Sequence, residues 1–507
     1  MQLVVNEKPF LVLGGELGNS SASDMNYMRP IWPKLTAMHL NTVLAPVYWE
    51  LLEPQEGVYD FTLVDSMIAA ARANQLKLVL LWFGTWKNSM SCYVPAWVKK
   101  DTRRFPRAQD KQGRGQEILT PFSNNNLAAD VKAFSALMQH IKETDSRSST
   151  VIMIQVENEI GMLPEARDHG PAANDAFARN VPPALMSYLQ QHKTSLAPSL
   201  VQAWQSNGLK TIGTWEAVFG KGLATDEIFI AWHFAQFANS VTEAAKKIYP
   251  LPMFVNAALN RPGVKPGDYP SGGPLPHLID VWKAGAPAID FLSPDFYNPD
   301  FKQWNDLYTR ADNPLFIPEI RFEPSVAAKV FYAIGHYQAI GFAPFSIEST
   351  DHAAEEPVGL SYAVLAQLSS LVSAAQGKGV MEGFLLDKTK ASDTVKLGGY
   401  TFVIKHDYTL GWSPGAKEAQ WPQAGGLIIQ TGPDEFTVAG TGIVLTFFSD
   451  QPDQPIAGIL SIDEGSYING QWIPVRRMNG DQSHQGRHLR IPVGETGIQK
   501  LQLYRYK

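Results

Sequence analysis

Two carboxylates and an amide follow directly after an apolar run in residues 151–161. The run 151–156 is too short for a helix, and its apolar and β-branched residues are typical of a strand buried on both faces. Glu157, Asn158 and Glu159 come immediately after it. Burying such groups is costly unless they are paired. We therefore interpret Asn158 and Glu159 as functional groups at a strand end, whereas Glu157 suits a solvated loop equally well.

A second glutamate, Glu319, lies inside the apolar run 315–320. An unpaired carboxylate in such a run is costly, so a structural role is disfavoured. Two carboxyl groups that face each other across a substrate can hydrolyse a glycoside. One protonates the leaving oxygen, and the other attacks the anomeric carbon or activates water.

Short apolar segments alternate with helical patterns along residues 10–375, which predicts a (β/α)8 barrel. The eight expected strands are 10–15, 41–47, 77–83, 151–156, 252–257, 289–296, 315–320 and 341–347. An open doubly wound sheet is the alternative, but no glycine-rich dinucleotide fingerprint follows the first strand. In a barrel, the ends of strands four and seven lie on opposite sides of one mouth, so Glu159 and Glu319 can face each other.

The pattern changes after Gly377. Strands such as 400–404, 426–430 and 442–448 are separated by Gly, Pro and Asp, and Asn469-Gly470 and Asn479-Gly480 predict hairpin turns. We predict a barrel catalytic domain over residues 1–378 and a β-sandwich-like accessory domain over residues 379–507.

Length, composition and charge indicate a globular protein and argue against some classes of partner. A chain of 507 residues exceeds one ordinary core, and 45% hydrophobic residues indicate a globular protein. The net charge of −6 comes without a basic patch or charged tail, so we expect no nucleic-acid partner and no membrane partner. We also expect no apolar run long enough to span a bilayer. The oligomeric state stays open.

Cys92 is the single cysteine, and no histidine spacing suggests a metal site. We expect no disulfide, no metal and no cofactor. The first residues show no signal-peptide pattern. This leaves a cytoplasmic protein, or a periplasmic or secreted one whose signal has been removed.

Asn158-Glu159 and Glu319 resemble the signature of the large glycosidase clan with (β/α)8 barrels. The resemblance implies that Glu159 is the acid/base, that Glu319 is the nucleophile, and that configuration is retained.

Further motifs are similar to glycoside hydrolase family 35, the β-galactosidases. They are Gly14-Gly15-Glu16, Asn41-Thr42-Val43, the segment 48–61 with Tyr48, Glu53 and Pro54, and the segment 155–159. The loop after the third strand departs from that family, because Trp86-Lys87-Asn88 stands where a small residue and a glutamate contact the galactose hydroxyls.

The predicted function is a retaining exo-β-galactosidase that removes terminal galactose from oligosaccharides. The expected substrate-binding residues are Tyr48, Glu53, Trp86, Asn88, Asn158 and Tyr297. The alternatives are another retaining β-glycosidase (a β-glucosidase or endo-glucanase), a non-catalytic carbohydrate-binding barrel, and a metal-dependent barrel enzyme. Both glutamates disfavour the second alternative, and the missing His/Asp ligand cluster disfavours the third.

Overall fold

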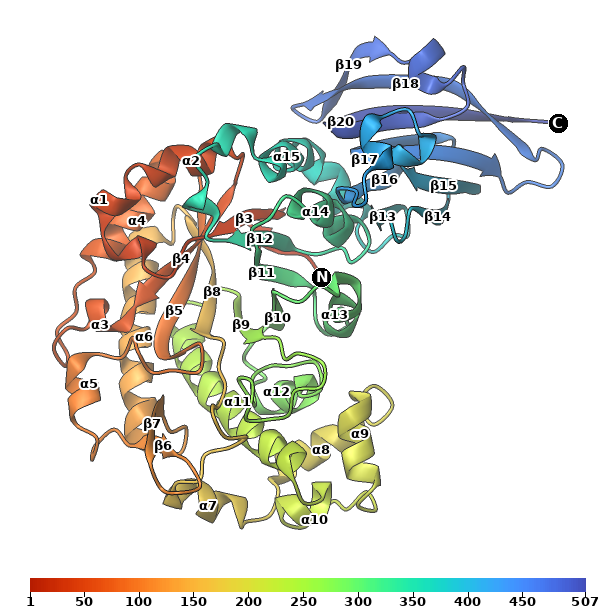
Figure 1. Cartoon of the computed structure of the whole chain (residues 1–507). Coiled ribbons are helices and arrows are strands. Elements are labelled where there is room, and N and C mark those ends of the chain that lie inside the picture. Colours follow the sequence, from red (N-terminus) through yellow and green to blue (C-terminus); the bar gives the residue numbers. More distant parts are fainter. The chain divides into compact units, whose positions relative to one another are not determined.

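Eight parallel strands close into a barrel in the computed structural model, which describes residues 1–507 (Figure 1). Their spatial order is β10-β11-β12-β3-β4-β5-β8-β9. The strands are β3 Val12–Glu16, β4 Thr42–Tyr48, β5 Lys77–Lys87, β8 Val151–Asn158, β9 Met253–Ala258, β10 Phe291–Phe296, β11 Phe316–Arg321 and β12 Gly341–Phe345. Each coincides with a predicted strand, so the (β/α)8 prediction is confirmed.

Helices connect these strands. They are α1 Met25–Met28, α2 Ile31–Ala37, α3 Trp49–Leu52, α4 Thr62–Ala73, α5 Ala96–Lys100, α6 Asn124–Asp145, α7 Pro171–Phe177, α8 Pro183–Gln191, α9 Pro198–Gln205, α10 Trp215–Phe219, α11 Leu223–Ile248, α12 Ile279–Gly285, α13 Phe301–Tyr308, α14 Val326–Gly335 and α15 Pro357–Ala375. Two short strand pairs, β1 Val4–Val5 with β2 Lys8–Pro9 and β6 Arg107–Gln109 with β7 Gly115–Leu119, complete this part.

Strand β8 is anchored at its start by the helix that precedes it. Helix α6 begins where the Ser123 hydroxyl accepts a hydrogen bond from the Asn126 N–H, and it buries a stripe that includes Phe134 and Leu137. At its end, the Asp145 carboxylate accepts from the first N–H of β8, at Val151 (2.7 Å). All eight residues of β8 are buried. The apolar run is therefore the buried strand, and the polar residues that follow it lie at the carboxyl-end rim of the barrel.

Contacts between residues divide the chain into two compact units. One comprises Met1–Gly15, Pro33–Asn41 and Arg321–Lys507, and the other comprises Glu16–Trp32 and Thr42–Ile320. Both predicted catalytic glutamates and all the predicted substrate-binding residues lie in the second unit. The domain boundary at residues 378 and 379 stays a prediction.

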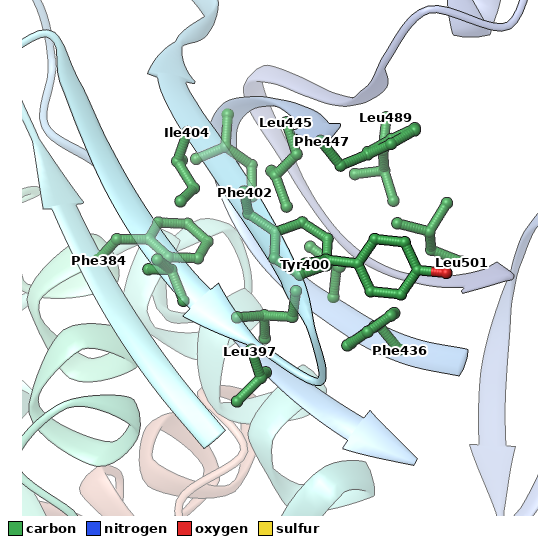
Figure 2. Close-up of a cluster of buried hydrophobic side chains, with 14 of the residues drawn as sticks. Phe384, Leu397, Tyr400, Phe402, Ile404, Phe436, Leu445, Phe447, Leu489 and Leu501 are labelled. Carbon is green, nitrogen blue, oxygen red and sulfur yellow. The ribbon is translucent and has the colours of Figure 1, made fainter. Parts of the chain in front are cut away.

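The C-terminal strands form one antiparallel sheet of eight, whose core is shown in Figure 2. The strands are β13 Met381–Leu386, β14 Ser392–Leu397, β15 Tyr400–His406, β16 Ala424–Gly432, β17 Glu435–Ser449, β18 Ile456–Ile468, β19 Gln471–Arg477 and β20 Leu489–Tyr506. β17 pairs with β16 along its first half and with β15 along its second half. The change falls at Gly442, whose φ of +70° suits a bulge, so the sheet folds over its own core as a sandwich does.

One of the two predicted hairpin turns is confirmed. Asn469 and Gly470 both have positive φ and join β18 to β19, with Ile468 paired to Gln471. The other prediction is wrong. The Asn479 side chain accepts a hydrogen bond from the Gly480 N–H and begins a short 3₁₀ helix instead.

Helix α15 corrects the expectation about apolar runs. By length and composition alone it is long and apolar enough to cross a membrane, and half of that stretch is buried inside the protein. It contacts α14, β18 and β20 of its own compact unit. Packing on several neighbours demands apolar residues around most of a helix, which explains the composition.

Helix α14 lies against β13 and β16 where the strands carry glycine. An added Cβ at Gly425 would lie 2.5 Å from the backbone oxygen of Ala328. We therefore expect Gly425→Ala to lower the free energy of unfolding by about 1–3 kcal/mol, because the helix must move away. Thermal or urea unfolding measures this. Gly497→Ala is the matched control, since nothing lies within 4 Å of its Cβ position. Equal stability of the two variants would contradict this packing.

Candidate active site

Glu159 and Glu319 meet at the rim of the barrel together with a third carboxyl group, Asp295. Glu159 follows β8 with a φ of +46°, and Asp295 in β10 is the direct parallel partner of Glu319 in β11. All three are buried, and one oxygen from each lies within 4.8 Å of the other two. Retaining glycosidases hold their two carboxyl groups about 5–5.5 Å apart, whereas inverting ones need about 6.5–9.5 Å. Oxygens within 4.8 Å are compatible with the shorter, retaining separation.

Asn256 in β9 connects two of these groups. Its side-chain oxygen accepts from the Glu159 N–H (2.9 Å), and its side-chain N–H donates to Asp295 (2.6 Å). One amide therefore fixes both the backbone of Glu159 and the carboxyl group of Asp295. Sequence reasoning missed Asn256, although a polar residue inside the apolar run 252–257 was a usable signal.

Tyr297 donates a hydrogen bond from its hydroxyl to Oε1 of Glu319. The structure thus brings together Tyr297 and Glu319, which the sequence placed in the site. Burial, and then the charge of Glu319, raise the pKa of the Tyr297 hydroxyl, so it remains a donor. Donation to a carboxylate favours the ionised form of that carboxylate.

Burial, and then the negative charge of Glu159, raise the pKa of Glu319 to about 7. Lys87 and the Tyr297 hydrogen bond act in the opposite direction. Because two close carboxylates resist a second ionisation, the pair of Glu159 and Glu319 favours a state with one shared proton.

The surroundings of Asp295 favour its neutral form. Burial, followed by the charges of Glu319, Glu159 and Glu16, raises its pKa well above the usual range. A neutral carboxyl group is a poor nucleophile, and the amide of Asn256 already holds one of its oxygens. Glu159 and Glu319 are therefore the two groups with a charge and a proton to exchange.

Lys87, the last residue of β5, is the cation nearest to Glu159. Its Nζ lies 4.0 Å from Oε2 of Glu159, and both side chains are about nineteen-twentieths buried. The sequence marked this loop as a departure from the family pattern but did not assign Lys87 a role. Three clustered carboxyl groups can in general hold a cation. Here the ammonium of Lys87 already lies beside Glu159, and the side-chain N–H of Asn256 already donates to Asp295, so two of the three carboxyl groups have partners within the protein.

Asn158 and Asn88 are the predicted substrate-binding amides. Asn158 is fully buried beside Lys87, and neither its amide nitrogen nor its amide oxygen has a partner within the protein. Buried amides normally make hydrogen bonds, so Asn158 is a candidate to bind substrate hydroxyls, which stays a prediction. Asn88 is exposed, and its side-chain oxygen contacts the Lys87 ammonium.

Trp86 and Glu53 are enclosed by other parts of the protein, and their binding to substrate stays a prediction. The Trp86 indole is fully buried against Phe234 and Phe237 of α11, and its N–H donates to the backbone oxygen of Leu119. Its size favours a core position here over a sugar platform.

Glu53 fastens a loop instead. It is 1% exposed, and its two oxygens accept from the Trp49 indole (2.8 Å) and the Gly57 N–H (2.7 Å). The ring of Tyr48 is also buried, in contact with Phe83 and Tyr93. The contacts of Glu53 and Tyr48 are therefore with neighbouring residues of the barrel rim.

Glu157 lies outside the carboxyl cluster, although it is two residues before Glu159. It is fully buried, and its Oε2 accepts from the Trp86 N–H (2.7 Å). Asp130 of α6 lies beside it and accepts from the backbone and hydroxyl of Thr85. Burial, and then the charge of Asp130, raise the pKa of Glu157 well above its usual range. Glu157 is therefore a neutral group that braces the end of β5, not a solvated loop residue.

Residues 23–220 match the family model described as "Beta-galactosidase" of glycoside hydrolase family 42, and residues 358–490 match a domain of unknown function, DUF5597. The narrower resemblance to family 35 is therefore not supported, whereas the larger clan is consistent with the match.

The chain is 28% identical over 181 residues to a β-galactosidase from Xanthomonas manihotis, which covers 34% of this chain and 27% of that one. It is 26% identical over 177 residues to β-galactosidase-1-like protein 3 from Homo sapiens, which covers 34% and 25%. The matched part thus spans about a quarter of these relatives. The fold is also similar to Gan42B, a family 42 β-galactosidase from G. stearothermophilus, with a TM-score of 0.54, 10% identity and 98% of both chains covered.

The neutral state of Glu157 predicts a pH-dependent stability. The unfolded chain releases this proton near pH 4.3, while the folded chain keeps it, so folding weakens as the pH rises above that value. Glu157→Gln keeps an acceptor for Trp86 and does not titrate. We expect its unfolding free energy, relative to the wild type, to improve steadily between pH 5 and pH 8 in urea unfolding.

Glu157→Ala is the control, because it leaves the Trp86 N–H without its acceptor and should be about 1–3 kcal/mol less stable than Glu157→Gln at every pH. A Gln variant whose stability runs parallel to the wild type across this range would show that Glu157 is ionised in the folded protein.

Proposed function

We propose that this protein is a retaining exo-β-galactosidase that works by double displacement, with Glu319 as nucleophile and Glu159 as acid/base. The observation that carries the proposal is the approach of these two buried carboxyl groups at the ends of β8 and β11, with oxygens within 4.8 Å. An approach this close supports the retaining arrangement, in which the second carboxylate itself attacks the anomeric carbon.

In the first displacement, the ionised carboxylate of Glu319 attacks the anomeric carbon. The bond to the leaving oxygen breaks, and Glu159 gives its proton to that oxygen. The hydroxyl of Tyr297 favours the charge on Glu319 in the free enzyme. The product is a covalent ester between the sugar and Glu319.

In the second displacement, Glu159 takes a proton from water as the water attacks the anomeric carbon from the face that the aglycone left. The ester bond breaks, Glu319 regains its carboxylate, and Glu159 is again protonated. Two inversions at one carbon give net retention. Asn158 supplies an amide to sugar hydroxyls close to both carboxyl groups.

The choice of galactose is supported by the match of residues 23–220 to a β-galactosidase family and by the two relatives named as β-galactosidase or β-galactosidase-like. A panel of 4-nitrophenyl glycosides tests it directly. We expect the highest kcat/KM on the β-galactoside, and a higher value on the β-glucoside would replace galactose by glucose in this proposal.

Azide rescue separates the roles of the two glutamates. Glu319→Ala should abolish turnover, because the covalent intermediate cannot form. Azide should then restore activity and give the galactosyl azide of inverted configuration, since the anion attacks from the vacated side. Glu159→Ala should keep partial activity on an activated aryl galactoside, and azide should give the retained product. On poor leaving groups the loss should reach about 10²–10⁴-fold.

Proton NMR of the azide product reads out its configuration. Retained azide from the Glu319 variant together with inverted azide from the Glu159 variant would exchange the two assignments. Tyr48→Phe is a useful control, because it keeps the ring contacts with Phe83 and Tyr93 and leaves both carboxyl groups in place.

A further inference from the structure

Lys87 is a buried cation that faces a site made mostly of acids. Its ammonium lies 4.0 Å from Glu159 and about 5.2 Å from the centre of the Phe83 ring. Its positive charge also acts on Glu319 and on Asp295. A cation in such a position is retained only where charges compensate its loss of hydration.

The backbone holds this ammonium in place. Lys87 and Met90 exchange backbone hydrogen bonds of 2.8 and 2.9 Å around a turn in which Asn88 and Ser89 both have positive φ. Two such residues give the tight turn that joins paired strands. The Ser89 N–H donates to the backbone oxygen of Glu159 (3.2 Å), so the turn that carries Lys87 is fastened to the residue that Lys87 faces.

We propose that Lys87 is a positioning residue that holds Glu159 in the ionised form required by the second displacement, and that it thereby lowers the upper pH limit of the first. This inference rests on the function proposed above. It goes beyond that function because it gives a role to the Trp86-Lys87-Asn88 loop, which departs from the family 35 pattern: the loop assists the second displacement rather than the first.

The two displacements need opposite states of Glu159. In the first it must carry a proton, and in the second it must accept one. Once Glu319 is esterified, its negative charge is gone, and Lys87 then faces Glu159 with one competing carboxylate fewer. An opposite charge at about 4–6 Å favours ionisation of a carboxyl group by about 1–3 pH units. Lys87 therefore favours the ionised form of Glu159 that the second displacement needs and disfavours the protonated form that the first displacement needs.

The other charges around this pair are few. Glu319 and Asp295 face Glu159 from β11 and β10, Glu16 at the end of β3 acts on Asp295, and the Tyr297 hydroxyl donates to Glu319. The carboxyl groups among these neighbours each raise the pH at which the shared proton leaves. Lys87 is the charged group that acts in the opposite sense, which makes its effect separable by substitution.

The test compares Lys87→Met with the wild type on an activated aryl galactoside. The wild-type kcat/KM should fall at high pH, where the carboxyl pair loses the proton that the first displacement needs. In Lys87→Met this fall in kcat/KM, the alkaline limb of the pH profile, should move to higher pH by at least about one unit. At the same time, kcat and KM should both fall, by about 10-fold, because a smaller fraction of Glu159 is ionised without the cation, which slows the second displacement so that the covalent intermediate accumulates.

Two matched variants exclude trivial explanations. Lys87→Arg keeps the charge and should keep the position of the limb near that of the wild type. Lys246→Met removes a lysine that pairs with Asp290 at 2.7 Å outside the carboxyl cluster, and it should leave both the limb and kcat unchanged. Thermal unfolding of each variant shows whether it folds.

A measurement without turnover keeps the inference testable if the wild type hydrolyses no glycoside, which would overturn the proposed function alone. Infrared difference titration of protein with ¹³C-labelled glutamate carboxyl groups follows the shared proton, and the band that disappears in Glu159→Gln assigns it. In Lys87→Met this band should titrate at higher pH. An unchanged band, or an unmoved kinetic limb with a uniformly lower rate, would mean that Lys87 has only a structural role.

Discussion

Three buried carboxyl groups within 4.8 Å of one another form the constraint on which the rest of the site depends. Like charges at that distance in a poorly hydrated place cannot all ionise. Burial and the neighbouring charges favour the neutral form of Asp295, Tyr297 donates a hydrogen bond to Glu319, and the ammonium of Lys87 lies beside Glu159. A shared proton and a single charge are what a two-step displacement at a sugar carbon requires.

The barrel makes this arrangement possible because each group belongs to a different strand. Glu159 follows β8, Asn256 lies in β9, Asp295 in β10 and Glu319 in β11, and strand pairing sets their spacing. Rigid strands hold reacting groups more accurately than loops do. Lys87 is the last residue of β5, and the two-residue turn after it is fastened to Glu159 by a backbone hydrogen bond.

Much of this follows from residue patterns. Buried parallel strands consist of short apolar runs, so the amino-acid sequence alone predicts all eight barrel strands. Glu319 is recognisable because it interrupts such a run. Side-chain direction at the strand ends could not be predicted. Alternation would place Glu157 and Glu159 on the same face. Both residues instead have positive φ, so Glu157 braces β5 while Glu159 joins the cluster.

Partnerships between distant residues leave no such pattern. Nothing local shows that Trp86 packs on α11, or that the oxygens of Glu53 are taken up by the Trp49 indole and the Gly57 N–H. The amide of Asn256 acquires its importance only when two strands that are far apart in sequence bring Glu159 and Asp295 to it.

The central claim is that Glu319 is the nucleophile. A 2-deoxy-2-fluoro-β-galactosyl fluoride reacts with a retaining enzyme to form an ester that hydrolyses slowly, because the fluorine at C2 destabilises the charged transition state while fluoride leaves readily. Peptide mapping of the inactivated protein by mass spectrometry then locates the sugar. The account predicts one sugar per chain, attached to Glu319. A sugar attached to Glu159 or Asp295, or inactivation without a covalent label, would contradict it.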